Sequence, residues 1–479
     1  MLNRRRFIQS GAVLGAPAAL AQQKEGALAP GFTPVDKPNV IWLFSDQHRA
    51  QAIAHNGDPN VSTPTMDRMM VDGMTFTNAI SGFPLCCPFR GSLLTGRYAH
   101  KCVPGHEHPL PDGQPTLAQP LKEAGYHTAW FGKWHLGGWR ARDGRAAYYI
   151  LPRNKRGGFD TWVGYENNNS QWDCWVHGGE GKDAFHYRLP GYETDELTNL
   201  FIRHLKERAA ANQAGRRQPF FAALSVQPPH DPYVAPEDYM RRYRPGALEL
   251  RPNVPASKAI QQQARRELAG YYAMVENWDH NMGRIWRALD ELGLARETHI
   301  IHLSDHGDML GSHGQFRKMN PYEESIRIPF TITGELARYQ QRRVGSTDAF
   351  LNAPDIAPTT LGLCGIRKPE WMQGADLSGL RLVGREQQAK PDSAYLQTVI
   401  PTGHGHSVNK PYRGVVTVDG WKYACFEGVS YVMYNLNDDP YEQVNLAHNN
   451  RYTVERKKLI ARTRQWAADL GDTFVFPEN

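Results

Sequence analysis

Four short polar clusters in the chain combine acidic, amide, histidine and lysine side chains. They are Ser45-Asp46-Gln47-His48, Gly132-Lys133-Trp134-His135, Gln227-Pro228-Pro229-His230 and Ser304-Asp305-His306-Gly307-Asp308. A lone Asp often caps a helix or forms a turn, and a lone His is more often a packed or surface residue than a catalyst. Because these alternatives would have to hold independently at all four clusters, the set as a whole indicates an enzyme.

Two of the clusters supply side chains that bind a divalent cation. The first offers oxygen atoms from Asp46 and Gln47, and the last offers an oxygen from Asp305 and a nitrogen from His306. Hard oxygen ligands favour Ca²⁺, Mg²⁺ or Mn²⁺, and one imidazole moves the preference slightly toward Mn²⁺. A dinuclear zinc site would need more His and Asp ligands than the clusters supply. We therefore predict one bound cation.

The segment FPLCCPFRGSLLTGR has the features of a helix that begins at an anion-binding position. Pro88 suits the first turn of a helix and Gly96 suits its end. Cys86 would then lie at the helix N-terminus, where free backbone N–H groups and the helix dipole favour an anion. Arg90 follows one turn later, with a guanidinium that matches a tetrahedral oxyanion. We therefore predict that Cys86 is a nucleophile or a redox-sensitive thiol rather than a buried structural cysteine.

Each polar cluster directly follows a short apolar run of the kind that forms a buried strand. The four runs are Asn39–Phe44, Thr128–Phe131, Pro219–Val226 and His299–Leu303. Apolar residues at helical spacing from Ala259 to Leu294 predict a long helix between the last two runs. Strands that alternate with helices predict an α/β fold with a mostly parallel central sheet. Because ligands bind beyond the carboxyl ends of parallel strands, we expect the four clusters to meet in one cleft.

The C-terminal part of the chain has a different pattern. A stretch rich in Gly, Pro and polar residues around Arg367–Asp376 precedes it. Alternating segments at Tyr412–Asp419, Trp421–Glu427 and Tyr431–Leu436 predict a small antiparallel sheet, and a last helix is predicted at Val454–Leu470. We place the boundary near residue 380, which gives a catalytic domain over residues 35–380 and a C-terminal α+β subdomain over residues 381–479.

The N-terminus matches a twin-arginine export signal. Residues 1–21 contain Arg4, Arg5 and Arg6, then a short apolar run, and then a small-residue cleavage site at Ala19-Leu20-Ala21. A basic disordered tail is the alternative interpretation. We predict export by the twin-arginine route to the periplasm or the extracellular medium.

The charge of the chain indicates neither a nucleic-acid partner nor a membrane. Lys and Arg exceed Asp and Glu by 55 to 49, and removal of the signal takes away three arginines and no acidic residue. The remaining basic residues are scattered, as on an ordinary solvated surface. The chain has no apolar run long enough to span a bilayer. Its six cysteines fit neither a zinc-site spacing nor a dense disulfide scaffold, so their pairing stays open.

Taken together, these motifs resemble the sulfatase family of the alkaline phosphatase superfamily. Cys86-x-Pro88-x-Arg90 followed by LLTGR is similar to the motif in which sulfatases oxidise the cysteine to formylglycine. GKWHLG from Gly132 is similar to the family's second motif, and SDHG from Ser304, with Lys318, and the segment Tyr434–Leu446 also match. The resemblance covers residues 38–446 and implies an alkaline-phosphatase-like α/β/α sandwich beside a smaller C-terminal α+β domain with an antiparallel sheet.

The resemblance implies a role for each residue of the Cys86 motif and for two lysines. Cys86 would become formylglycine, whose hydrate attacks sulfur and holds a covalent sulfate. Arg90 would hold that hydrate, and Lys133 and Lys318 would neutralise sulfate oxygens. A formylglycine-generating enzyme is therefore an implied partner during maturation.

The remaining roles concern proton transfer and the metal. His135 would take a proton from the remaining hydroxyl to break the covalent intermediate, and His230 would protonate the leaving alcohol. The implied metal ligands are Asp46, Gln47, Asp305 and His306, with Ca²⁺ as the expected cation and Mg²⁺ or Mn²⁺ as alternatives. Charge clamps of this kind suit the transfer of a tetrahedral anion.

Three positions depart from the common sulfatase pattern. Phe89 stands where many sulfatases have Ser, Gln47 replaces a second Asp, and His306 replaces the commoner Asn. The combination of Gln47 and His306 is similar to phosphonate monoester and phosphodiester hydrolases of the same superfamily, which also use formylglycine. Such a hydrolase is therefore the alternative function.

We predict an exported sulfatase that hydrolyses sulfate esters of a sulfated carbohydrate. The carbohydrate rests on export and on the aromatic and polar stretch Trp162–Trp175, which suits stacking on sugars but also suits loop packing. Candidates to line the substrate pocket, each with a structural role as the alternative, are His106, His108, His404 and His406. An inactive exported sugar-binding protein is the alternative from another class, and the intact set of charged residues argues against it.

Overall fold

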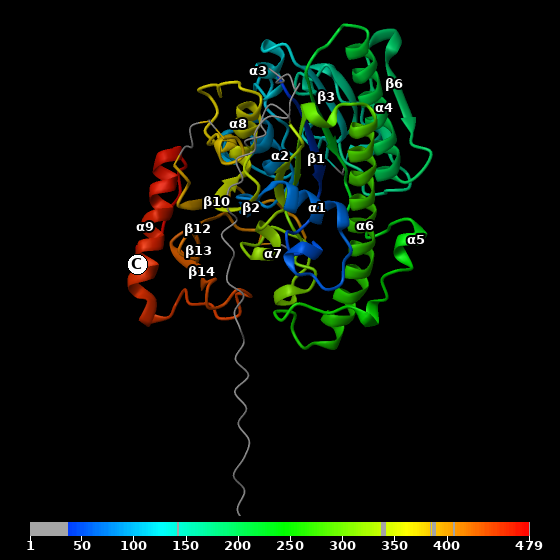
Figure 1. Cartoon of the computed structure of the whole chain (residues 1–479). Coiled ribbons are helices and arrows are strands. Elements are labelled where there is room, and N and C mark those ends of the chain that lie inside the picture. The colour runs from blue at the N-terminus through cyan, green and yellow to red at the C-terminus, as the bar shows by residue number, and fades with distance from the viewer. Residues whose placement is uncertain are drawn as a thin grey trace, which may run out of the picture.

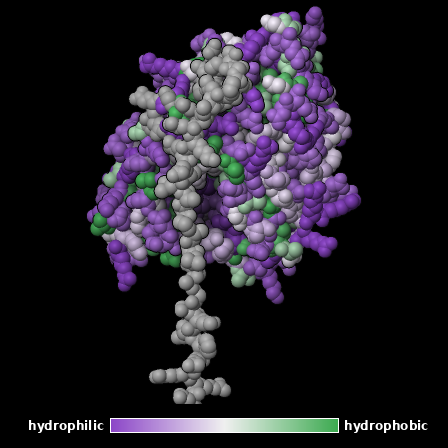
Figure 2. Space-filling model, viewed as in Figure 1, coloured by the Kyte–Doolittle hydropathy of each residue, from purple (hydrophilic) through white to green (hydrophobic). Residues whose placement is uncertain are grey.

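The computed structural model describes residues 37–140, 143–336, 342–383, 385, 389–405 and 408–478. The predicted export signal and His406 lie outside these ranges. Within them, no helix combines the length and the apolar character needed to cross a membrane. Figure 2 shows one face of the molecule as mostly hydrophilic, with small separate hydrophobic groups.

A ten-stranded sheet forms the centre of the molecule, in the order β10-β2-β9-β8-β1-β7-β3-β4-β5-β6 (Figure 1). The strands are β1 (Asn39–Ser45), β2 (Met74–Ile80), β3 (His127–Lys133), β4 (Thr161–Tyr165), β5 (Trp175–Gly178), β6 (Phe185–Arg188), β7 (Phe220–Ser225), β8 (Thr298–Ser304), β9 (Phe330–Thr333) and β10 (Gly345–Asn352). The five central strands, from β8 to β4, are parallel, whereas β9 and β5 run antiparallel to their neighbours. The predicted fold class is confirmed, and the four predicted strands are β1, β3, β7 and β8.

The register of the central strands places their carboxyl ends at one edge. Ser45 at the end of β1 pairs with Ser304 at the end of β8, and Ser225 at the end of β7 pairs with both Phe44 and Gly132. The residues that follow these strands therefore begin side by side. This confirms the prediction that the four polar clusters meet at one end of the sheet.

Helices cover both faces of the sheet, because alternate side chains of a strand point to opposite faces. The helices are α1 (Pro64–Asp72), α2 (Cys86–Thr95), α3 (Ala118–Glu123), α4 (Glu193–Gln213), α5 (Glu237–Met240), α6 (Lys258–Glu291), α7 (Glu323–Ile326), α8 (Ala353–Leu363) and α9 (Thr453–Leu470). Trp42 and Phe44 of β1 share a core with residues of α2, α3 and α8. Ile41 and Leu43 share a second core with α1, α4 and α6. Helix α6 confirms the long predicted helix but ends three residues before Leu294, ahead of the left-handed Gly293.

A second, four-stranded antiparallel sheet lies near the C-terminus (Figure 1). Its strands are β11 (Ser393–Thr398), β12 (Tyr412–Thr417), β13 (Trp421–Phe426) and β14 (Val429–Asn435). One face packs against α9, for example Met433 with Ile460. The other face shares a core with Ile80 and Phe350 of the large sheet. Three strands and α9 confirm the prediction, whereas β11 was not predicted; the division into domains at residue 380 stays a prediction.

Candidate active site

Helix α2 begins at Cys86, as the sequence predicts. The backbone of Leu85 is extended, and the helix ends at Gly96, whose φ of 64° is in the left-handed region that favours glycine. Pro88 occupies the first turn, where its missing N–H leaves no hydrogen bond unmade. Every residue of α2 is buried. The N-terminal end of this helix therefore presents Cys86 inside the molecule rather than on its surface.

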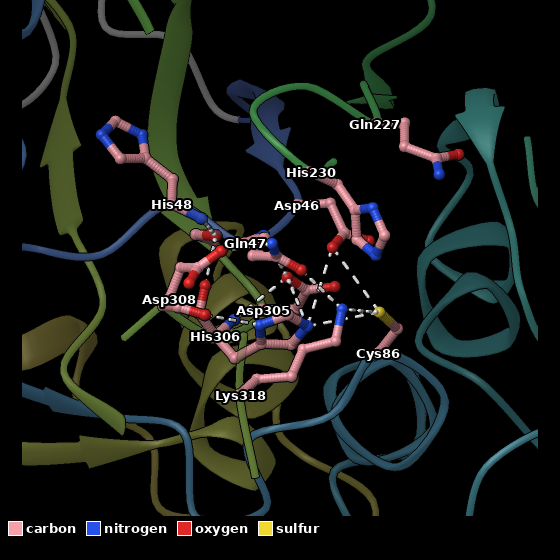
Figure 3. Close-up of polar contacts among 12 residues, drawn as sticks. Asp46, Gln47, His48, Cys86, Gln227, His230, Asp305, His306, Asp308 and Lys318 are labelled. Atoms are coloured by element: carbon pink, nitrogen blue, oxygen red, sulfur yellow. Dashed lines mark hydrogen bonds and ion pairs between the residues drawn. The ribbon is translucent and has the colours of Figure 1, made fainter. Parts of the chain in front are cut away.

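Cys86 lies at the edge of a group of polar side chains that includes Asp46, His306 and Lys318 (Figure 3). Its Sγ is 3.2 Å from His306 Nε2 and 3.5 Å from Asp46 Oδ1. The Nζ atoms of Lys318 and Lys133 lie 3.6 and 3.9 Å from the same sulfur. Burial, and after it the charge of Asp46, raises the pKa of the Cys86 thiol to about 11. As a bare thiol, Cys86 is therefore protonated at neutral pH and a poor nucleophile.

Two of these neighbours, Asp46 and His306, form with Asp305 a set of side chains suited to a cation. Asp46, Asp305 and His306 are buried, and their ligand atoms lie within 4.8 Å of one another and of the Cys86 sulfur. His306 Nδ1 is 3.0 Å from the carbonyl oxygen of Gly307, to which it donates, so the lone pair is on Nε2. This Nε2 lies 3.6 Å from an oxygen of each carboxylate. Burial and the adjacent Asp46 raise the pKa of Asp305 to about 7, so a divalent cation would relieve the repulsion between the two carboxylates.

Gln47, predicted as a fourth ligand, lies beside this set but has other partners. Its backbone is left-handed, with a φ of 66°. Its Oε1 accepts a hydrogen bond of 2.6 Å from Lys318 Nζ, and its Nε2 donates one of 2.6 Å to Asp308 Oδ2. The amide oxygen therefore points into the site, where a cation and Lys318 would share it.

The guanidinium of Arg90 contacts the carboxylates of both Asp46 and Asp305. Its Nη2 lies 3.0 Å from Asp46 Oδ2 and 3.2 Å from Asp305 Oδ2. Its Nη1 donates to the carbonyl oxygen of Lys133 at 3.0 Å and to Ser225 Oγ at 2.9 Å. In the described structure, Arg90 thus contacts the predicted metal ligands rather than the Cys86 sulfur. Its predicted role of holding the nucleophile stays a prediction.

The site carries a surplus of positive charge. Lys133 Nζ lies 2.8 Å from Asp46 Oδ2. Burial alone would raise the pKa of Asp46, but Lys133, His230, Arg90 and Lys318 together hold it well below its usual range. Nearest to Cys86, three permanent cations, Lys133, Lys318 and Arg90, therefore face the two carboxylates of Asp46 and Asp305. The carboxylates of Asp308 and Asp231 contact Gln47, and Asp231 also lies beside Arg317. Such a site favours an anionic group placed beside Cys86.

His230 lies at the rim of the site. Its Nδ1 is 2.7 Å from the carbonyl oxygen of Asp231, which assigns the proton to Nδ1 and the lone pair to Nε2. Burial and the nearby Lys318 lower the pKa of His230 to about 4. The side chain is 12% exposed. This partial exposure fits a residue that meets the leaving group of a substrate.

His135 also lies near this centre, but its ring contacts His106. It is 4% exposed, and its backbone is left-handed with a φ of 57°. Its ring packs edge-on against His106 at 5.8 Å. Burial, Lys133 and His106 together lower its pKa well below the usual range.

Sequence reasoning did not select three polar residues that support the site. Asp308 Oδ2 accepts from Tyr233 Oη at 2.5 Å as well as from Gln47. Asp231 lies 3.3 Å from Arg317 Nε and beside His230. Ser225 anchors Arg90. All three could have been found from their positions in the sequence, because Ser225 ends β7, Asp231 adjoins His230 and Asp308 closes the fourth polar cluster.

The histidines predicted to line the pocket and the aromatic stretch Trp162–Trp175 lie in different surroundings. His404 packs edge-on against His106 at 5.7 Å, and His108 Nδ1 lies 2.9 Å from the carbonyl oxygen of His106. His106 and His404 therefore join the C-terminal part of the chain to the catalytic end of the sheet. Trp162 is 3% exposed and packs against Trp134 at 5.0 Å, as the loop-packing interpretation predicts.

Trp172, in the same predicted stretch, is different. Its side chain is 46% exposed. The preceding residue, Gln171, is buried and donates to the carbonyl oxygen of His230 at 3.1 Å. The ring of Trp172 packs at 5.2 Å on buried Tyr192, and its carbonyl oxygen accepts from Arg188 Nη2 at 3.0 Å. Trp172 is therefore an exposed indole packed on Tyr192, and it directly follows a residue whose side chain contacts the backbone of His230.

Comparison with known proteins gives a consistent family. A sulfatase family profile matches residues 38–366, and a profile for the C-terminal part of N-sulphoglucosamine sulphohydrolase matches residues 311–469. The chain is 34% identical to an ulvan-active sulfatase of Formosa agariphila over 445 residues, which are 91% of this chain and 82% of that one. A putative sulfatase of Bacteroides fragilis has a similar structure, with a TM-score of 0.80, 26% identity and coverage of 92% and 98%. A phosphonate monoester hydrolase of Agrobacterium radiobacter shares the fold, with a TM-score of 0.73, 22% identity and coverage of 91% and 96%.

Proposed function

This chain belongs to the sulfatase family, and from that premise we propose that it hydrolyses sulfate esters of a carbohydrate with a formylglycine made from Cys86. The family makes it a sulfuric ester hydrolase. One observation carries the proposal: Cys86 lies within 4 Å of two lysines and two predicted metal ligands, in a buried site with a surplus of positive charge. This arrangement suits a nucleophile that meets the sulfur of a sulfate ester among groups that hold its oxygens.

A bound metal ion and a modified Cys86 would supply chemistry that unmodified side chains cannot provide. Asp46, Asp305 and His306 would hold a divalent cation, with Gln47 beside them, and such a cation withdraws charge from an anion bound near it. Oxygen-rich ligands support Ca²⁺ as the cation. Formylglycine would supply a hydrated aldehyde whose hydroxyl is the nucleophile, which explains why a thiol with a pKa of about 11 stands at this position.

The chain's own residues then hold charge and move protons. Lys133 and Lys318 lie on the Cys86 side of the site and would neutralise sulfate oxygens as negative charge develops. His230, whose Nδ1–H donates to the carbonyl oxygen of Asp231, would take a proton from solvent on Nε2 when the anionic substrate is bound and deliver it to the leaving oxygen. His135 is assigned the second proton transfer, which frees the site of sulfate.

The proposal that the alcohol part is a carbohydrate rests on two features. The relative named for activity on ulvan acts on a sulfated glycan. Trp172 presents an exposed indole, and the residue before it, Gln171, contacts the backbone of His230, where the alcohol would leave. Aromatic faces of this kind stack on the apolar faces of sugar rings. We place Trp172 on the leaving-group side of the site.

Paired substrates test the reaction. We expect the mature enzyme to hydrolyse an aryl sulfate and sulfated oligosaccharides much faster than an aryl phosphonate monoester. The matched control is Lys318→Met, which should lower all rates together. Hydrolysis of the phosphonate with no turnover of any sulfate would establish the alternative hydrolase. Binding of a sulfated glycan without turnover, in protein whose Cys86 is modified, would establish the inactive sugar-binding protein.

The mass of the Cys86 peptide tests the nucleophile. Protein from its own host should give an aldehyde mass at Cys86. An unmodified thiol in fully active protein would overturn the formylglycine proposal, whereas a thiol in inactive protein would locate the fault in maturation and point to Phe89. Export is tested separately: replacement of Arg5 and Arg6 by Lys should retain the protein inside the cell if the twin-arginine route is used.

A further inference from the structure

A second group of metal-binding side chains lies beside the catalytic centre. Cys87, His106 and His135 place one ligand atom each within 4.8 Å of one another. Cys87 and His135 are buried and His106 is half-buried. The cluster shares no residue with Asp46, Cys86, Asp305 and His306, the group assigned above to the catalytic cation.

Adjacent cysteines can serve two clusters because of helix geometry. Cys86 and Cys87 are the first two residues of α2, and consecutive residues of an α-helix point about 100° apart. The sulfur of Cys86 faces Asp46 and His306, while the side chain of Cys87 belongs to the core between α2 and the large sheet. The two thiols therefore face different partners.

The three side chains are oriented as ligands. The Nδ1 atoms of His106 and His135 are both buried without a hydrogen-bond partner in the described structure. His106 Nε2 lies 3.8 Å from the Glu107 carboxylate, whose negative charge favours a cation on this imidazole. The backbone N–H of Glu107 donates to the Cys87 sulfur. A buried imidazole nitrogen without a partner is costly, and a bound cation would satisfy both.

The ligand types differ between the two clusters and so select different cations. The catalytic set is mostly carboxylate, which suits hard cations such as Ca²⁺. One thiol and two imidazoles suit Zn²⁺, which takes sulfur and nitrogen ligands in tetrahedral sites and can keep a fourth position for water. We propose that Cys87, His106 and His135 form a second metal site that binds Zn²⁺ or a cation of the same class.

Occupancy of this site would have a consequence for the reaction. His135 carries a proton transfer in the proposed function, and a cation on its ring would remove it from that role. Zn²⁺ would therefore inhibit the enzyme without displacing the catalytic cation. This consequence rests on the proposed function, whereas the metal site itself does not.

Cobalt binding tests the site without any substrate. The Cys86→Ala variant, saturated with Ca²⁺, removes the neighbouring thiol and makes maturation irrelevant. Titration with Co²⁺ should bind one equivalent with a thiolate-to-cobalt charge-transfer band, and Zn²⁺ should displace it. Adding Cys87→Ser should abolish the band and weaken Co²⁺ binding by at least about tenfold. Adding Cys102→Ser, at a buried cysteine outside the cluster, should change neither the charge-transfer band nor the affinity for Co²⁺.

Two results would overturn the proposal. One is Co²⁺ binding with no thiolate band, and the other is the same band and affinity after Cys87→Ser. In the mature enzyme, Zn²⁺ added in excess Ca²⁺ should inhibit turnover, and Cys87→Ser should keep its basal turnover while losing at least tenfold in sensitivity to Zn²⁺. Because the cobalt titration needs no turnover, an error in the proposed substrate would leave its outcome unchanged.

Discussion

Two buried clusters of charge in this protein differ in how completely they are paired. The catalytic centre has Lys133, Lys318 and Arg90 against two carboxylates. A second cluster, here called the junction cluster, lies where α7 meets the small sheet and consists of Glu323, Glu324, Glu442, Lys422, Arg327 and Arg251. Both clusters are deep enough that an unpaired charge would be costly.

In the junction cluster each cation meets a carboxylate. Lys422 Nζ lies 2.6 Å from Glu323 and 2.7 Å from Glu442. Arg327 Nε lies 2.7 Å from Glu323, and Arg251 Nε lies 2.8 Å from Glu324. Three carboxylates thus face three cations. The difference indicates that buried charges paired in equal numbers stabilise the fold, whereas the surplus of positive charge at the catalytic centre is available to bind an anionic substrate.

Removal of the nucleophile should have the largest effect on the catalytic centre. Cys86→Ala should lower turnover of an aryl sulfate by ~10⁴-fold or more, because the variant has no group that can become the nucleophile. The melting temperature should stay close to that of the wild type, since Ala preserves the helix start. Substantial turnover by Cys86→Ala would disprove the role of this residue.

Loss of one surplus cation should reduce catalysis and leave folding intact. Lys318→Met should lower kcat/KM by about 10²–10³-fold, the typical effect of removing one group that stabilises developing negative charge. Because three cations face two carboxylates in the free site, the variant should unfold at a similar urea concentration. A large loss of stability in this variant would mean that the two clusters do not differ in the way proposed.

The matched change in the junction cluster should do the reverse. Lys422→Met leaves Glu323 and Glu442 buried beside one another without their shared cation, so it should destabilise the protein by about 3–5 kcal/mol. The remaining folded protein should keep its kcat. Urea unfolding followed by activity measurement at low temperature separates the two effects, and an unchanged stability would count against the comparison.

Glu193 provides a third arrangement, a buried carboxyl held by neutral donors. Its Oε1 accepts from Tyr165 Oη at 2.5 Å and from the backbone N–H of Gln227 at 2.8 Å. Burial raises its pKa from 4.5 to about 7. The folded protein therefore keeps this proton where the unfolded chain has lost it, and the stability it contributes is complete below pH 4.5 and lost as the pH rises to about 7.

Glu193→Gln should remove that pH dependence. Between pH 4.5 and 7, this group should lower the free energy of unfolding of the wild type by ~3 kcal/mol. In Glu193→Gln this contribution is absent, so the free energy of unfolding should fall by ~3 kcal/mol less over the same range. Urea unfolding of both proteins across this range measures the difference. Parallel stability curves for the two proteins would show that Glu193 does not titrate in this range.

The smallest effect is expected at the rim of the catalytic centre. Trp172→Ala should raise KM for a sulfated oligosaccharide about 2- to 10-fold, the loss of one aromatic contact, with little change in kcat. KM for a small aryl sulfate should change less, because its leaving group is shorter than a saccharide chain. Equal changes for both substrates would place Trp172 outside the sugar-binding part of the site.

The elements that the sequence predicted are those whose signal is local. Strands β1, β7 and β8 are buried on both faces. The sequences of β1 and β7 are almost entirely apolar, and that of β8 is apolar except for buried residues such as His299 and His302. Strand β11 was not predicted because its buried Gln397 is polar and is satisfied by His100, a residue almost 300 positions away in the chain. Burial of a polar side chain by a distant partner leaves no pattern in the nearby sequence.

The same distinction applies to the catalytic centre. The positions of Asp46, Asp305 and His306 at strand ends were predictable from the order of strands and polar clusters. The partners of Gln47 and His135 were not, because both residues have left-handed backbones that redirect their side chains. Only tertiary packing holds a non-glycine residue in that conformation. This is why Gln47 contacts Lys318, and His135 groups with Cys87.

Under the proposed function, the burial of α2 also determines when Cys86 can be converted to formylglycine. All ten residues of this helix are inaccessible once the sheet has formed, and Cys86 itself is 2% exposed. An enzyme that converts Cys86 must therefore reach the chain before α2 packs. A chain that folds first keeps its thiol for its whole lifetime. The fraction of active molecules then depends on the rate of Cys86 conversion relative to the rate of folding. Slower folding during expression would therefore increase the yield of active protein.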